Sequence, residues 1–371
     1  MKKKILFIFA MVAFMLISVP NVYASTTITQ DDFDSAKAGT PSNGVSYTEA
    51  SGHKWYSLTA GEEFVLGGDV NLDDAFLDSN NNTLNLNGHG ITNAEVLGED
   101  MLLNAYDRDL TLTGTGTVGR NVIVGGGTLT LDGNITYNGT VTISDGTDAG
   151  TAVVNAGTFN GGFESANSTA TINAGTFVGD GWGAALQLNN STTTIKGGTF
   201  TAGGASSTYI EGGSTTITGG TFTSAGDNGI EIFDDSTNLT ISGGTFTGAV
   251  SGLAINDNPT VKLSGGTFKA TGTGADAGAI RAEGTFASLL ASGYKYSSAS
   301  TTTTGVYSVK ETSVVTGKTT STTTTDTVAT TESEATINNP KTGDNIIIYI
   351  SLLGLSLIAL SATYTKKKKL N

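Results

Sequence analysis

The chain has few histidines and arginines, which leaves little for acid–base chemistry or for clamping phosphate. The 371 residues include two His and three Arg, and there is no Cys. His89 lies between two glycines, in Gly88-His89-Gly90, and two adjacent carboxylates follow at Asp234 and Asp235. A His and a carboxylate share general acid–base work only where both reach the same substrate by hydrogen bonds. Whether these residues meet therefore depends on the fold.

A short repeat organises the middle of the chain. The phrase Gly-Thr-Phe or Gly-Gly-Thr-Phe recurs at intervals of 18 to 24 residues, with its Phe at positions 159, 177, 200, 222, 246, 268 and 286. An aliphatic residue stands five positions before each of the first six: Val154, Ile172, Ile195, Ile217, Ile241 and Leu263. Fixed spacing within a unit and variable spacing between units indicate rigid strands joined by turns of different lengths. A period near 20 is typical of a solenoid in which each repeat forms one coil.

The alternation inside each repeat predicts which side chains face inward. In Thr216-Ile217-Thr218 the Ile points inward and both Thr point outward, because successive side chains of a strand lie on opposite faces. Stacked coils then align the aliphatic residues as one internal ladder and the Phe residues as another. The glycines before each Phe suit a tight corner that requires positive φ. We therefore predict an all-β fold, a single-chain parallel β-helix with coils about 4.8 Å apart.

Composition divides the chain into segments around this solenoid. We predict an N-terminal cap at 25–60, the β-helix with a C-terminal closing strand (Gly305–Val309) at 61–311, and a disordered Ser/Thr-rich stalk at 312–338. The stalk is predicted from low hydrophobicity without any period.

The repeat resembles the right-handed parallel β-helix of the pectate-lyase-like superfamily, over about residues 60–296. The resemblance implies the right hand, and it raises an enzymatic interpretation, because the superfamily contains pectin-degrading lyases and hydrolases. His89 and the Asp234-Asp235 pair resemble polygalacturonase motifs, but their order along the chain is reversed. About six coils separate them, or about 30 Å, so we expect both to be turn residues. Arg281 is the one Arg in the regular coils, and no acidic cluster recurs beside it at one-coil spacing. We predict no catalytic residue, no metal site and no cofactor.

A binding face is easier to derive than an active site. Aligning the second apolar pair of each repeat places Gln187, Tyr209, Glu231 and Ala254 in one outward row, with Asn189, Glu211, Phe233 and Asn256 beside it. Exposed aromatic side chains are the usual platforms for sugar rings. We therefore expect glycan contact at six residues: Trp182, Gln187, Tyr209, Glu211, Glu231 and Phe233.

The net charge of the chain limits the classes of partner that we expect. The formal net charge is −14. A surface of this sign repels nucleic acid and anionic lipid, so we expect no nucleic-acid partner. Without Cys there are neither disulfides nor thiolate metal sites.

The N-terminus has the features of a secretory signal peptide. Three lysines precede an apolar stretch that ends before Pro20, and a small-residue site follows. We predict a signal peptide at 1–24, with cleavage between Ala24 and Ser25.

The C-terminus (339–371) has three features in order: a pentapeptide, an apolar run at 346–364 and four lysines. The run is about 19 residues, roughly 28 Å as a helix, which suffices to cross a bilayer core. The lysines resist translocation. The pentapeptide, Asn339-Pro340-Lys341-Thr342-Gly343, closely resembles the sorting signal of Gram-positive surface proteins, whose commonest form begins with Leu. In that family sortase cuts between Thr and Gly and links the Thr to the cell wall.

The sequence thus predicts an extracellular surface protein attached covalently to a Gram-positive cell wall. Its expected partners are sortase, the peptidoglycan precursor, and host or bacterial glycans, with the membrane involved only at the precursor stage. The predicted role is that of an adhesin or glycan-contacting β-helix without catalysis. A wall-tethered polysaccharide lyase or glycoside hydrolase of the same fold is the alternative.

Overall fold

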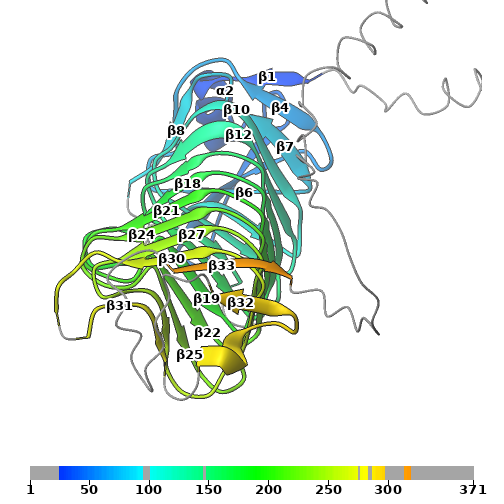
Figure 1. Ribbon diagram of the computed structural model, residues 1–371. Coiled ribbons are helices and arrows are strands. Elements are labelled where there is room, and N and C mark those ends of the chain that lie inside the picture. Colours follow the sequence, from blue (N-terminus) through cyan, green and yellow to red (C-terminus); the bar gives the residue numbers. More distant parts are fainter. Residues whose placement is uncertain are drawn as a thin grey trace, which may run out of the picture. The chain divides into compact units, whose positions relative to one another are not determined.

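The described part of the chain forms a parallel β-solenoid built from two sheets. The computed structural model describes residues 25–94, 101–144, 148–274, 276–282, 286–296 and 313–318, which belong to one compact unit ending at Ser321. One sheet has 21 strands and the other has 12. Each regular coil passes twice through the larger sheet and once through the smaller one. Figure 1 shows the coils stacked in chain order, from blue through green to yellow. The predicted β-helix is confirmed.

Apart from its two C-terminal strands, the larger sheet consists of two rows, and in each row a strand pairs in parallel with its counterpart in the next coil. The first row contains β1 (Thr26–Ile28), β4 (Glu63–Leu66), β7 (Asn82–Asn85), β10 (Leu110–Val118), β12 (Thr128–Tyr137), β14 (Thr151–Val154), β17 (Thr169–Ile172), β20 (Thr192–Ile195), β23 (Ser214–Ile217), β26 (Asn238–Ile241) and β29 (Thr260–Leu263).

The second row follows the first across a corner. It contains β5 (Val70–Asn71), β8 (Gly90–Thr92), β15 (Thr158–Phe159), β18 (Thr176–Val178), β21 (Thr199–Ala202), β24 (Thr221–Ser224), β27 (Thr245–Gly248) and β30 (Thr267–Ala270). The long strands β10 and β12 run through the corner and belong to both rows.

The 12-stranded sheet closes each coil. Its first two strands form an antiparallel hairpin and all later neighbours pair in parallel. The sheet contains β2 (Val45–Ala50), β3 (His53–Leu58), β6 (Phe76–Asp78), β9 (Met101–Tyr106), β11 (Asn121–Gly125), β13 (Val141–Ile143), β16 (Phe163–Ala166), β19 (Leu186–Asn189), β22 (Thr208–Glu211), β25 (Ile230–Phe233), β28 (Ser251–Ile255) and β31 (Gly278–Ala282).

Two side-chain ladders fill the interior, as predicted. The six aliphatic residues from Val154 to Leu263 are fully buried and pair in register from coil to coil. The aromatic ladder runs from Tyr137 to Phe268, with neighbouring ring centroids 4.4 to 4.9 Å apart and ring planes within 15°. Tyr137 was not expected there. Its hydroxyl is buried without a hydrogen-bond partner among the described residues.

The corner between the two rows explains the glycine before each Thr-Phe. Gly198 has a φ of 107°, a conformation that L side chains rarely adopt, and a Cβ built there would lie 3.2 Å from the carbonyl oxygen of Gly175. A side chain at this position would therefore be both strained and crowded. This confirms the predicted role of the glycines.

The segment predicted as the N-terminal cap contains regular elements. Residues 25–60 hold β1, the helix α2 (Gln30–Lys37) and the β2–β3 hairpin, so the first coil is already formed here. Phe33 of α2 is fully buried and packs edge-on against Tyr56 of β3, with centroids 5.1 Å apart. The helix thereby covers apolar side chains that no preceding coil would cover.

At the other end the repeat stops before its seventh copy. Phe286 begins the short 3₁₀ helix η1 (Phe286–Leu289) and does not continue the ladder of strands. The strand β32 (Tyr294–Tyr296) pairs with β33 (Ser313–Lys318), and β33 also pairs antiparallel with β30. An antiparallel strand thus covers part of the last parallel edge. It occupies residues that were predicted to belong to the stalk.

Several predicted features lie outside the described residues. They are the signal peptide with Ala24, the closing strand Gly305–Val309, most of the stalk, the pentapeptide Asn339–Gly343 and the apolar run at 346–364. Within the part of the chain that is described, no helix is long and apolar enough to span a membrane.

Candidate functional site

The 12-stranded sheet carries one continuous row of residues that alternate with the core. Each is the Cα partner of the next along the stack, from β3 to β31. The row consists of Ser57, Asp78, Asn104, Ile123, Thr142, Glu164, Gln187, Tyr209, Glu231, Ala254 and Arg281. We call it the outward row. The strand spacing of about 4.8 Å makes it a regular series along the solenoid.

The structure brings five of the six predicted contact residues together on this face. Gln187, Tyr209 and Glu231 are consecutive in the outward row, and Glu211 pairs with Phe233 beside it. The rings of Tyr209 and Phe233 lie 6.0 Å apart, inclined by 38°. Ala254 has the predicted register but is buried, since it lies between the longer side chains of its two row neighbours.

Trp182 lies in the turn before β19 and not on the sheet. It is 87 % exposed, and its ring lies against Gly204 in the next coil, where an added Cβ would approach the indole to 2.7 Å. The indole is therefore a surface side chain that rests on backbone, as expected for a contact residue, although it is not in the same row as Tyr209.

A surface pocket of about 450 Å³ lies where β22 and β25 end. It is lined by Glu211, Phe233, Asp234 and Asp257. Asp234 has a φ of 73° and accepts a hydrogen bond from the backbone N–H of Ser236 at 2.7 Å. That bond lowers the pKa of the Asp234 carboxyl. The residue thus caps its own turn, which agrees with the turn role predicted from the sequence, and its negative charge contributes to an acidic pocket.

A buried hydroxyl connects two carboxylates beside the aromatic pair. Ser206 Oγ lies 3.0 Å from Asp227 Oδ2 and 2.7 Å from Glu231 Oε2, and its single proton is shared between them. The other Glu231 oxygen accepts a hydrogen bond from Asn256 Nδ2 at 3.1 Å. Burial raises the pKa of Asp227, and the charge of Glu231 adds to this, against the opposing effects of Ser206 and Arg281.

Sequence reasoning missed Ser206 and Asp227, although one signal was present. Polar residues stand one to three positions before the strands β22 and β25, in Ser206-Ser207 and Asp227-Asn228. Glu164, also in the outward row, was missed too; burial and the nearby charge of Asp180 raise its pKa.

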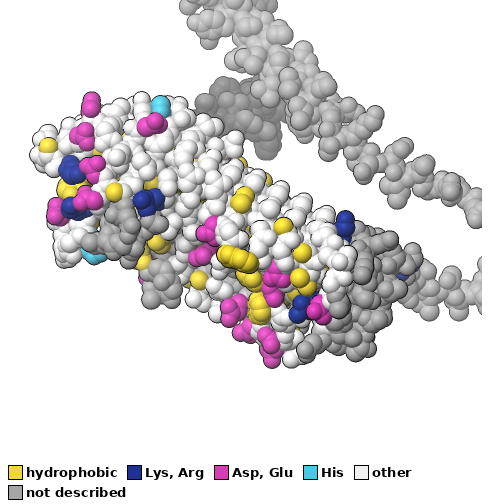
Figure 2. Space-filling model, turned by 90° about the vertical axis from the view of Figure 1, so that its left-hand side faces the viewer, with side chains coloured by type: hydrophobic (Ala, Val, Ile, Leu, Met, Phe, Trp, Pro, Cys, Tyr) yellow, Lys and Arg dark blue, Asp and Glu magenta, His cyan; other side chains and the backbone are white. Residues whose placement is uncertain are grey.

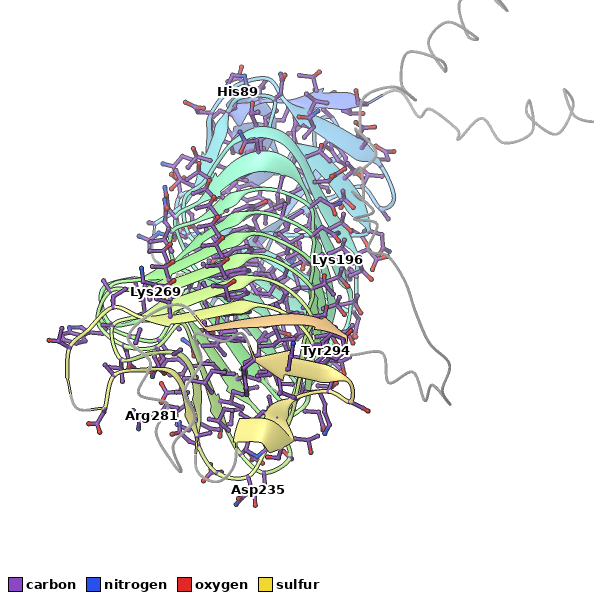
Figure 3. All side chains as sticks on the ribbon, viewed as in Figure 1. His89, Lys196, Asp235, Lys269, Arg281 and Tyr294 are labelled. Atoms are coloured by element: carbon purple, nitrogen blue, oxygen red, sulfur yellow. The ribbon has the colours of Figure 1, made fainter. Side chains whose placement is uncertain are left out.

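The residues that resemble polygalacturonase motifs do not meet. Figure 3 shows His89 among the N-terminal coils and Asp235 at the opposite end of the solenoid. His89 Nδ1 lies 3.6 Å from Asp69 Oδ1 at a different pocket of about 570 Å³. Arg281 is on β31, nearer to Asp235 than to His89 in the same view. Among the described residues no group of three or more His, Asp and Glu side chains is placed to hold a metal ion.

The face drawn in Figure 2 has an uneven charge distribution. Acidic side chains gather with hydrophobic ones over the C-terminal coils, in the lower part of the view, whereas acidic and basic side chains are mixed at the left-hand end beside the His residues. The acidic pocket and the Ser206 cluster together hold five carboxylates, and Arg281 lies two coils from Glu231 in the outward row. These carboxylates belong to Glu211, Asp227, Glu231, Asp234 and Asp257. The region therefore repels anions.

A second aromatic cluster lies at the other end of the same sheet. Trp55 of β3 pairs with Phe76 of β6, and their rings are 6.3 Å apart with planes within 19°. Tyr106 of β9 is also exposed nearby, and all three line one pocket. The repeat does not extend into this region, so no alignment of repeats could place these residues together.

Comparison of the chain with protein-family models, with curated protein sequences and with solved structures finds no match.

Proposed function

We propose that this chain is a cell-wall-anchored surface protein whose solenoid contacts glycans through the 12-stranded sheet, without catalysis. The signal peptide, the sorting pentapeptide and the apolar run carry the anchoring part of the proposal. In this proposal the Ser/Thr-rich segment at 319–338 serves as a spacer between the solenoid and the wall.

The single observation that supports glycan contact best is the Tyr209–Phe233 pair beside the acidic pocket. A sugar ring has an apolar face that packs on aromatic carbon and hydroxyls that bond to carboxylates. Phe233 offers the first surface, and Glu211 offers the second within the same pocket.

The negative charge of this region limits which glycans it can bind. The carboxylates around Phe233 repel uronic acids and phosphate-bearing polymers. We therefore propose that the contacted glycan is uncharged or carries amino groups.

The environment of Glu231 supports binding over hydrolysis. Glycosidase carboxylates flank the scissile bond and leave the space between them to substrate or water. Here the Ser206 hydroxyl lies between Asp227 and Glu231, and both Glu231 oxygens already accept hydrogen bonds. The alternative is a wall-tethered polysaccharide lyase or glycoside hydrolase, for which Asp227 and Glu231 would be the candidate carboxylates.

The binding proposal is tested with the full chain on an array of uncharged, amino-bearing and uronic oligosaccharides. Tyr209→Ala and Phe233→Ala should each weaken binding about tenfold, the loss expected for one aromatic contact of about 1.4 kcal/mol. Thr240→Ala, at an exposed position of the 21-stranded sheet, is the matched control and should leave binding unchanged. Equal affinity of all variants would contradict the proposed face.

The alternative is tested by incubating the same panel with the full chain and measuring released products. A hydrolase should turn over at least one member and lose that activity in Asp227→Asn and in Glu231→Gln. Binding without any product contradicts it.

The anchoring proposal is tested in the expressing cell. Thr342→Ala should move the protein from the covalent wall fraction to the membrane and medium fractions, while Thr336→Ala, outside the pentapeptide, should not. Continued wall attachment of the Thr342→Ala chain would overturn the proposal.

A further inference from the structure

The pocket near the N-terminal end of the 12-stranded sheet has the lining of a specific ligand site. Its volume is about 420 Å³, within the range of small-molecule sites. It lies over β3, β6 and β9, several strands away from the Tyr209–Phe233 pair. Its lining includes Trp55, Phe76, Asp78, Asn104, Tyr106 and Arg108. We call it the Trp55 pocket.

The apolar part of the Trp55 pocket is aromatic. The indole of Trp55 and the ring of Phe76 stack across neighbouring strands, so the two rings stabilise each other's position. Tyr106 is 37 % exposed, and it and Trp182 are the two exposed large hydrophobic residues in the described part of the chain. An exposed Tyr beside two ordered rings offers apolar surface together with a hydroxyl.

The polar part is a fixed set of planar groups. Arg108 Nη1 donates to Asp78 Oδ2 at 2.9 Å and to the backbone oxygen of Ser79 at 3.3 Å, which leaves Nη2 without a partner among the described residues. Asn104 Nδ2 donates to Asp78 Oδ1 at 3.3 Å. Asp78 therefore holds both the guanidinium and the amide in position.

One acceptor in this set has no partner. Asn104 is only 8 % exposed, and its Oδ1 is buried without a hydrogen bond from any described residue. An unpaired buried acceptor costs roughly 1–3 kcal/mol, and it calls for an explanation such as a water or a ligand group. Because this oxygen has almost no accessible surface, the Asn104 amide must turn toward the pocket before a bound hydroxyl can donate to it.

The charges of the Trp55 pocket select an uncharged ligand. Arg108 and Asp78 form an ion pair, so their charges compensate each other, and His53 and Ser51 complete the polar lining. The chain as a whole carries a formal charge of −14, which repels an anionic ligand at long range. A cationic ligand would compete with Arg108 for Asp78.

We propose that the Trp55 pocket binds one uncharged monosaccharide residue of a glycan. The apolar face of the sugar ring packs on Tyr106 and the edge of Trp55. One sugar hydroxyl accepts a hydrogen bond from the Arg108 guanidinium, and its neighbour donates one to Asn104 Oδ1. Hydroxyls suit this pair because each can both donate and accept. The proposal takes its ligand class from the proposed function, whereas its position rests on this pocket alone.

Calorimetric titration of the full chain tests this, with glucose, galactose, mannose and N-acetylglucosamine, and short oligosaccharides of each, as probes. Glucuronate is the charged comparator. At least one uncharged probe should bind, and Tyr106→Ala should weaken it at least tenfold, while Tyr106→Phe should retain most of the affinity. Arg108→Gln should also weaken it tenfold or more. Thermal unfolding of each variant shows that it is folded; Tyr106 is exposed, so its replacement should leave the fold intact.

Three results would overturn the proposal: no binding of any uncharged probe, unchanged affinity in folded Tyr106→Ala, or tighter binding of glucuronate. The two proposed sites are separable. Loss of binding in Tyr209→Ala and Phe233→Ala with normal binding in Tyr106→Ala contradicts the Trp55 pocket alone, and the reverse pattern contradicts the Tyr209–Phe233 face alone.

Discussion

The rings of Phe177 and Phe200 lie in consecutive coils and stack with centroids 4.7 Å apart and planes within 10°. This separation matches the distance between neighbouring strands, so the Phe of each coil contacts the equivalent Phe in the coils before and after it. Both rings are fully buried. Stability in this region therefore depends on contacts between coils, because one coil cannot bury its own ring.

Replacing a central ring should be costly. Phe200→Ala should lower the free energy of unfolding by about 3–5 kcal/mol, because two other rings lose the ring that stacks between them and a cavity is left. Urea unfolding measures the loss, and hydrogen exchange should localise it to the coils around β21. Trp182→Ala is the control and should change stability by less than about 0.5 kcal/mol, because the indole is exposed.

The corner glycines should tolerate no side chain. Gly198→Ala places a Cβ 3.2 Å from a neighbouring carbonyl oxygen at a φ of 107°, and should lower the free energy of unfolding by about 1–3 kcal/mol. Gly68→Ala is the matched control, because its Cβ would meet nothing within 4 Å and its φ is not in the left-handed region. Equal thermal stability of the two variants would contradict the corner explanation.

Asp227 should make the solenoid less stable as pH rises. Its folded pKa lies above the ordinary value of 3.8, mainly because of burial. Because the pKa of the Asp227 carboxyl is higher in the folded chain, this group adds to the free energy of unfolding below pH 3.8. That stabilisation is lost as the pH rises through the folded pKa. Asp227→Asn should therefore raise the melting temperature at pH 7, and the new amide can donate to Ser206 Oγ.

The gain should be small, about 1 kcal/mol or less, because solvent screens the partly exposed carboxyl. Thermal unfolding between pH 3 and 8 measures it, and the difference from the unmodified chain should disappear below about pH 3.8. A gain that persists unchanged at pH 3 would show that charge is not its cause.

Asp32 should have the opposite pH dependence. Burial raises its pKa, but hydrogen bonds from Ser42, from Thr29 and from Asn43 together outweigh burial and hold the pKa below 3.8. The stabilisation is therefore present above pH 3.8 and lost as pH falls through the lower folded value. Asp32→Asn removes a charged acceptor from the capping box with Thr29 and should destabilise the N-terminal cap by about 1–2 kcal/mol at pH 7. Chemical unfolding at pH 7 and at pH 3 measures the difference, which should shrink at the lower pH.

The repeat by itself determined most of the fold. A fixed offset of five residues between an aliphatic residue and a Phe is a property of the covalent chain, and strand alternation converts it directly into two inward ladders. The same alignment placed Gln187, Tyr209 and Glu231 in one row, because parallel stacking keeps equivalent positions in register.

The non-repeating parts were decided only by the tertiary structure. Trp55, Phe76 and Tyr106 are about 20 to 30 residues apart in the N-terminal coils, where no repeat fixes the register, and only the pairing of β3, β6 and β9 brings them to one pocket. Ser206 reaches Asp227 and Glu231 across coils because turns of different lengths fold back onto the sheet. Sequence periodicity thus determined which face each strand residue occupies. Contacts between coils determined which of these side chains form a site. Those contacts depend on turn conformations, which no repeat specifies.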